Sequence, residues 1–250
     1  MILHAVEAGE GPPLLLLHGL FGQARNFGAV QRALAADRRV LALDLRNHGA
    51  SPHDPRMDYP AMAADVAETL AARGIAAADA VGHSMGGKVA MALALLHPAL
   101  VPRLIVSDIA PVPYPPTFGP YAEAMLRVPA GATRAGADAA LAATVADPSV
   151  RAFLLSNRRP DGTWRLGLAG IVAAMPAIVG WDVPPMAPYR GRTLFVRGER
   201  SDYVADAHRD ACRALFPAAR FATIRDAGHW VHADQPAAFV EVVRGFLGAA

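Results

Sequence analysis

Short apolar runs separated by helix-like segments recur in the N-terminal part of this chain and again near its end. The runs are 13–17, 39–44, 77–81, 104–107, 192–197 and 220–224. Segments with helical spacing of apolar residues lie between or after them, at 26–36, 59–73, 86–96, 205–216 and 236–247. The runs are apolar throughout, as is typical of parallel strands that are covered on both faces. The alternation predicts an α/β fold with a mostly parallel, doubly wound sheet.

The alternation stops at a proline-rich segment, 110–116, which suits neither a strand nor a helix. Helical patterns without a clear strand continue from there to about residue 190. We therefore expect an α/β core at residues 1–111 and 191–250, interrupted by a helical cap at 112–190. The chain length of 250 residues fits one domain that carries an insertion.

Charge and cysteine content exclude several classes of protein. The 24 basic and 22 acidic residues leave a formal net charge of +2, which is too small for a nucleic-acid-binding surface. Cys212 is the single cysteine, so the chain has neither a disulfide framework nor a cysteine zinc site. We expect Cys212 to pack in the core, and we expect no metal ion and no nucleic-acid partner.

The N-terminal residues have neither a basic start nor an apolar stretch of signal-peptide length. The longest apolar run, 89–96, is much shorter than the ~20 residues that a membrane-spanning helix needs. We therefore expect a cytoplasmic protein without a membrane span, present as a monomer or a small homo-oligomer.

The pentapeptide Gly82-His83-Ser84-Met85-Gly86 has the pattern G-x-S-x-G. Alone it is a weak signal, and a structural serine in a glycine turn would produce it too. Here it follows an apolar run and opens a helix, which is the setting of a nucleophile elbow. The residues two before and two after the serine must be small in such a turn. The motif therefore predicts Ser84 as a catalytic nucleophile.

A serine hydroxyl needs a base to take its proton, and in this architecture the order along the chain is serine, acid, histidine. His229 follows the last predicted strand and is the best candidate for the base. The competitor is His232, which we interpret as a hydrogen-bonded structural histidine before a helix that Asp234 could cap.

Two carboxylates satisfy the order for the acid. Asp108 ends the run 104–107, and Asp202 lies in the turn after the run 192–197. The acid must hold the imidazole in one tautomer and stabilise its charged form, and the residues alone leave both candidates open. Asp226 is expected to shape the turn before His229.

The developing oxyanion needs hydrogen-bond donors. One predicted donor is the backbone N–H of Met85, directly after the nucleophile. The other should come from the loop 18–22, with the N–H of Leu20 as the first choice and that of Phe21 as the second.

The pairs His18-Gly19 and Gly228-His229, together with the pentapeptide 82–86, resemble the α/β-hydrolase superfamily over the whole chain. A narrower resemblance, to the YbfF-type esterases and their eukaryotic relatives, is carried by the segments 44–53, 107–112 and 228–232. It implies a cofactor-free serine hydrolase for carboxyl esters and, in some members, acyl-CoA thioesters. It also favours Asp108 as the acid, and Asn47 and His48 as structural residues of a loop near the site.

The leading hypothesis is a serine esterase that hydrolyses short- to medium-chain carboxylic esters through an acyl-enzyme on Ser84. Thioesterase, carbon–carbon bond hydrolase and cofactor-free perhydrolase activity remain alternatives, and a non-enzymatic binding protein is the alternative of another class. Arg158 and Arg159 could meet a CoA phosphate or form a solvated face. The cap offers aromatic and methionine side chains for lining the pocket or packing the cap: Tyr114, Phe118, Tyr121, Trp164, Met175, Trp181 and Met186.

Overall fold

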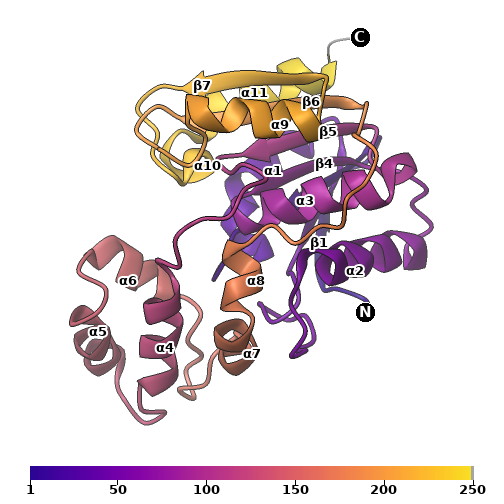
Figure 1. Ribbon diagram of the computed structural model, residues 1–250. Coiled ribbons are helices and arrows are strands. Elements are labelled where there is room, and N and C mark those ends of the chain that lie inside the picture. The colour runs from indigo at the N-terminus through magenta and orange to yellow at the C-terminus, as the bar shows by residue number, and fades with distance from the viewer. Residues whose placement is uncertain (249–250) are drawn as a thin grey trace.

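The computed structural model describes residues 1–248 as a seven-stranded sheet flanked by helices (Figure 1). The strand order is β1-β3-β2-β4-β5-β6-β7, and every pairing is parallel except that of β1 with β3. This confirms the predicted α/β class and the mostly parallel sheet. The strands are β1 (Ala5–Ala8), β2 (Pro13–Leu17), β3 (Arg39–Leu43), β4 (Asp79–His83), β5 (Arg103–Ser107), β6 (Arg192–Gly198) and β7 (Ala219–Ile224).

Strand β1 was not among the strands predicted from the sequence. It pairs antiparallel with β3 at the edge of the sheet, and its four residues are exposed or only partly buried. An edge strand with no buried face leaves no apolar run in the sequence, so its pattern is weak.

Alternating side chains of the central strands enter two separate cores. Leu15, Leu17 and Leu41 pack with helices α2 (Tyr59–Ala72), α3 (Met85–Leu96) and α9 (Arg209–Leu215) on one face. Leu14 and Leu16 pack with α1 (Gly28–Leu34) and α11 (Pro236–Gly248) on the other. Because both faces are covered, the central strands carry apolar residues on both faces.

The segment between β5 and β6 folds into helices and lies largely to one side of the sheet (Figure 1). We propose that residues 112–190 form a cap, and we use that name below. In Figure 1, α4, α5 and α6 lie away from the sheet, and α7 and α8 lie between them and the core. The cap helices are α4 (Gly119–Arg127), α5 (Arg134–Ala142), α6 (Pro148–Leu155), α7 (Leu168–Ala173) and α8 (Met175–Val179).

Candidate active site

Ser84 occupies a tight turn between β4, which ends at His83, and α3, which begins at Met85. Its φ of 51° and ψ of −121° are unusual for a residue with a side chain. A Cβ at Gly82 would lie 2.2 Å from the carbonyl oxygen of Gly86, and a Cβ at Gly86 would lie 2.2 Å from that of Leu17. The two glycines therefore meet the size limit expected of a nucleophile elbow.

A continuous hydrogen-bonded series joins Ser84 to a buried carboxylate. The Oγ of Ser84 lies 3.0 Å from Nε2 of His229, and Nδ1 of His229 lies 2.8 Å from Oδ2 of Asp108. Asp108 directly follows β5, and His229 lies in the loop between β7 and the short helix α10 (Val231–Asp234). Asp202 is exposed, and within residues 1–248 no hydrogen bond joins it to His229. Of the two candidate acids, the fold brings Asp108 to the imidazole.

Two residues beside Asp202 support this series, although the sequence analysis passed over them. The hydroxyl of Ser201 donates a hydrogen bond to Oδ2 of Asp108, and the N–H of Gly198 donates to Oδ1 at 3.2 Å. The ring of Tyr203 stacks on His229, with ring centroids 4.0 Å apart and planes inclined by 24°. The turn after β6 therefore contacts both the acid Asp108 and the imidazole of His229. These contacts come from Ser201 and Tyr203, the neighbours of Asp202 in the sequence.

His83, the variable residue before Ser84, holds the backbone of the histidine loop. Its Nε2 donates a hydrogen bond of 2.8 Å to the carbonyl oxygen of His229. Burial lowers the pKa of His83 well below its ordinary value, and the neighbouring His232 and His229 lower it further. The sequence analysis missed this role, because the motif allows any residue at that position.

His232 is buried, and its ring stacks on Phe27 with centroids 4.5 Å apart. Within residues 1–248 its Nδ1 has no hydrogen-bond partner. His232 is therefore held by packing, and its Nδ1 does not make the kind of hydrogen bond expected of a structural histidine. Asp234 accepts a hydrogen bond from the N–H of Gly228 at 2.7 Å, which ties down the loop directly before His229.

The loop after β2 carries the first-choice donor for the oxyanion, the backbone N–H of Leu20. The carbonyl oxygen of Gly19 accepts hydrogen bonds from Nδ1 of His18 at 2.8 Å and from the N–H of Gly22 at 2.9 Å. Since the peptide bond is trans, the N–H of Leu20 points to the opposite side of that peptide plane. The N–H of Phe21, the second choice, already donates to Nε2 of His48.

Neither the N–H of Leu20 nor that of Met85 donates to another group within residues 1–248. Met85 is the first residue of α3, so its N–H also lies at the positive end of the helix dipole. These two N–H groups are therefore available to a negatively charged oxygen near Ser84.

The sequence family with the α/β hydrolase fold matches residues 12–236 of the chain. The protein belongs to the α/β-hydrolase fold family. The sn-1-specific diacylglycerol lipase ABHD11 of Xenopus laevis is 43% identical over 96% of this chain and 81% of its own length. Esterase YbfF of Escherichia coli (strain K12) is 40% identical over 94% of this chain and 92% of its own length.

A solved structure of a marine microorganism esterase superposes with a TM-score of 0.94, at 34% identity, covering 98% of this chain and 99% of its own. The resemblance to YbfF-type esterases noted in the sequence is thus confirmed. The relatives are named as an esterase and a lipase, which supports the predicted class of carboxylic ester hydrolase.

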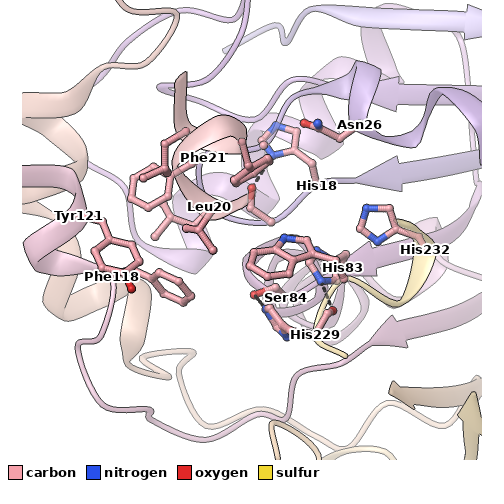
Figure 2. A pocket seen from close by; sticks show the side chains of 16 residues that line it. His18, Leu20, Phe21, Asn26, His83, Ser84, Phe118, Tyr121, His229 and His232 are labelled. Atoms are coloured by element: carbon pink, nitrogen blue, oxygen red, sulfur yellow. Dashed lines mark hydrogen bonds between the residues drawn. The ribbon is translucent and has the colours of Figure 1, made fainter. Parts of the chain in front are cut away.

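The α/β-hydrolase site opens into a first cavity, which is lined by Ser84 and His229 (Figure 2). In Figure 2, Ser84 and His229 lie on one side of it, and Phe118 and Tyr121 from the cap lie on the opposite side. A second cavity also reaches Ser84 and is lined by Tyr114 and again by Phe118.

The other cap side chains considered from the sequence line neither of these two cavities: Trp164, Met175, Trp181 and Met186. Val150, Phe153 and Leu154 line the first cavity instead. They belong to the predicted helical pattern of the cap, but the sequence did not show that α6 faces the site.

Cys212 and Arg158 are two further residues that the sequence singled out. Cys212 is buried in α9, and burial raises the pKa of its thiol to about 12. Arg158 is half-buried and donates hydrogen bonds to the carbonyl oxygens of Pro129, Ala130 and Ala132, so both terminal nitrogens of its guanidinium already have acceptors.

Residues 1–248 contain no group of three or more histidine, cysteine or acidic side chains placed to hold a metal ion. Over the same residues, no helix is both long enough and apolar enough to cross a membrane.

Proposed function

We propose that the protein is a serine esterase that hydrolyses short- to medium-chain carboxylic esters through an acyl-enzyme on Ser84. The observation that carries this proposal is the hydrogen-bonded series from Ser84 through His229 to Asp108. Its members occur in the chain order of an α/β-hydrolase triad, and the nucleophile has the backbone of an elbow. Relatives named as esterases and lipases agree with this reading.

In the acylation half-reaction, the Oγ of Ser84 attacks the ester carbonyl carbon while Nε2 of His229 takes the hydroxyl proton. Asp108 accepts the Nδ1–H hydrogen bond, which fixes the tautomer and stabilises the imidazolium that forms. The negative charge develops on the former carbonyl oxygen, where the N–H groups of Leu20 and Met85 stabilise it.

Collapse of the tetrahedral intermediate breaks the bond to the alcohol oxygen, which leaves with the proton carried by His229. A water molecule then attacks the acyl carbon and gives its proton to the same nitrogen. Breakage of the bond to Oγ returns that proton to Ser84 and releases the carboxylic acid, so the enzyme is regenerated without a cofactor.

Substitution of the nucleophile tests the proposal. Ser84→Ala should abolish turnover of p-nitrophenyl butyrate and labelling by a fluorophosphonate probe, while the circular dichroism spectrum stays unchanged. Ser107→Ala is a matched control, because Ser107 is equally buried and its hydroxyl has no hydrogen-bond partner within residues 1–248. Full activity of Ser84→Ala would refute the proposal.

A substrate panel tests the reaction class. Under the proposal, oxygen esters are cleaved faster than matched acyl-CoA thioesters, vinylogous diketones or peroxide-dependent substrates. A preference for one of the other groups, still lost in Ser84→Ala, would replace ester hydrolysis with that chemistry on the same residues.

A further inference from the structure

Ser84 lies where two cavities meet, and the two contain different parts of the catalytic series. The first cavity is lined by His229 and by Trp230 beside it. The second cavity is lined by Met85 but not by His229. Leu20 lines both.

If the proposed function holds, the direction of proton transfer assigns a substrate part to each cavity. The leaving oxygen must face His229, because that residue protonates it. The alcohol portion therefore occupies the first cavity. The oxyanion points to the N–H groups of Leu20 and Met85, so the remaining substituent of the carbonyl carbon, the acyl chain, extends into the second cavity.

The second cavity is lined by Lys88, the one lysine of the sequence. Lys88 lies four residues after Ser84 on α3, and only 1% of its surface is exposed. Its Nζ donates hydrogen bonds to the carbonyl oxygens of Val179 at 3.2 Å and Gly180 at 2.6 Å, at the end of α8. Most of the other lining residues are aliphatic or aromatic, and they include Ile109, Tyr114, Phe118, Ile178 and Tyr203.

The buried amine lacks a close counter-ion. Within residues 1–248, no carboxylate lies within 4.0 Å of Nζ, although Asp182 is near enough to raise its pKa. The rings of Tyr114 and Tyr59 lie 4.9 and 5.5 Å from Nζ. Burial is the larger effect and lowers the pKa of Lys88 to about 7.

An ammonium group has three N–H donors, and the two carbonyl oxygens satisfy two of them. A buried charge without a partner is costly, so an acceptor oxygen from a ligand would be stabilised strongly at this position. The end of a hydrocarbon chain placed there would instead cover the amine without accepting a hydrogen bond from it.

We propose that Lys88 is a specificity-determining residue that binds an acceptor oxygen at the far end of the acyl group. The preferred acyl group is short and carries a carbonyl or carboxylate oxygen a few carbons beyond the ester. This deepens the proposed esterase function and rests on it.

A purely structural role is the competing explanation, because Lys88 also joins α3 to the end of α8. Loss of such an anchor would slow the cleavage of all esters alike. Recognition of the acyl group changes the ratio between two esters of equal shape, so that ratio separates the two roles.

Ethyl 4-oxopentanoate and ethyl 4-methylpentanoate are nearly equal in size and differ by one carbonyl oxygen in place of a methyl group. We expect wild-type kcat/KM to favour the oxo ester by roughly tenfold, the value of one hydrogen bond to a charged group. In Lys88→Met, which keeps an unbranched side chain of similar length, the preference should vanish or reverse. Monoethyl succinate shows whether the acceptor is better supplied as a carboxylate than as a ketone.

Tyr59→Phe is the matched control. Its hydroxyl donates to the carbonyl oxygen of Ile178, so the variant loosens the same end of α8 while leaving the amine in place. It should affect both esters alike and keep the ratio.

Equal wild-type kcat/KM for the two esters would overturn the inference, as would an equal loss for both in Lys88→Met. The wild-type ratio decides alone if Lys88→Met does not fold. A wild-type protein that cleaves neither ester, nor p-nitrophenyl butyrate, would overturn the proposed function itself.

Discussion

The backbone N–H of Phe21 donates a hydrogen bond of 3.1 Å to Nε2 of His48. Because Nδ1 of His48 donates to the carbonyl oxygen of Arg46 at 2.8 Å, Nε2 is left as the acceptor of a neutral ring. Burial, with His18 nearby, lowers the pKa of His48 to about 3 and keeps it neutral. His48 thus fixes the loop that carries Leu20, and it lines neither of the two cavities at Ser84.

This relationship predicts a positioning role for His48. His48→Phe leaves the N–H of Phe21 without an acceptor and lets the loop shift, so kcat for p-nitrophenyl butyrate should fall about 10- to 100-fold with a smaller change in KM. His48→Gln, whose side-chain oxygen can accept the bond, should recover part of the loss.

His53→Gln is the control for His48, because His53 is exposed on the same segment. An equal change of kcat in His48→Phe and His53→Gln would contradict the prediction, as would a loss in His48→Phe that follows thermal stability alone.

The two candidate acids, Asp108 and Asp202, give the second prediction. Asp108→Asn leaves the packing nearly unchanged but removes the acceptor that selects the His229 tautomer, so kcat should fall by about 10³- to 10⁴-fold. Asp202→Asn alters an exposed side chain and should keep kcat close to that of wild type. Steady-state kinetics of both variants on one ester checks this, and a larger loss in Asp202→Asn would exchange their roles.

The sequence predicted Ser84 and His229 because a local setting and the order along the chain identify them. The choice between Asp108 and Asp202 needed the three-dimensional structure, since both residues follow neighbouring strands of one sheet. The path of the His229 loop decides which of the two carboxylates contacts the imidazole. The resemblance to the YbfF-type esterases favoured Asp108, whereas composition and periodicity did not distinguish the two carboxylates.

Other features depend on contacts between distant segments and left no local pattern. No local pattern marks Lys88, because its partners at 179 and 180 lie 91 and 92 residues away in the cap. Tyr203 gains its role only by stacking on His229. The edge strand β1 escaped prediction for the opposite reason, since it has too little buried surface to produce an apolar run.

The buried histidines give the third prediction, a loss of stability in acid. Burial lowers the pKa of His232 to about 4 and that of His48 to about 3, whereas both titrate near 6.5 when unfolded. Between these values the unfolded chain binds more protons than the folded one, so the free energy of unfolding falls as the pH falls below 6.5. Each such histidine contributes a slope of about 1.4 kcal/mol per pH unit.

His232→Phe isolates one contribution. The phenyl ring can keep the stacking on Phe27, and the imidazole that it replaces has an unpartnered Nδ1 within residues 1–248. Urea unfolding between pH 7.5 and 4.5 measures the free energy of unfolding at each pH. Below pH 6 this free energy should fall less steeply with decreasing pH in the variant than in wild type, by about the slope that one bound proton contributes. An identical pH dependence in wild type and variant would mean that His232 titrates alike in the folded and unfolded chains, and that its burial exerts no cost on the charged form.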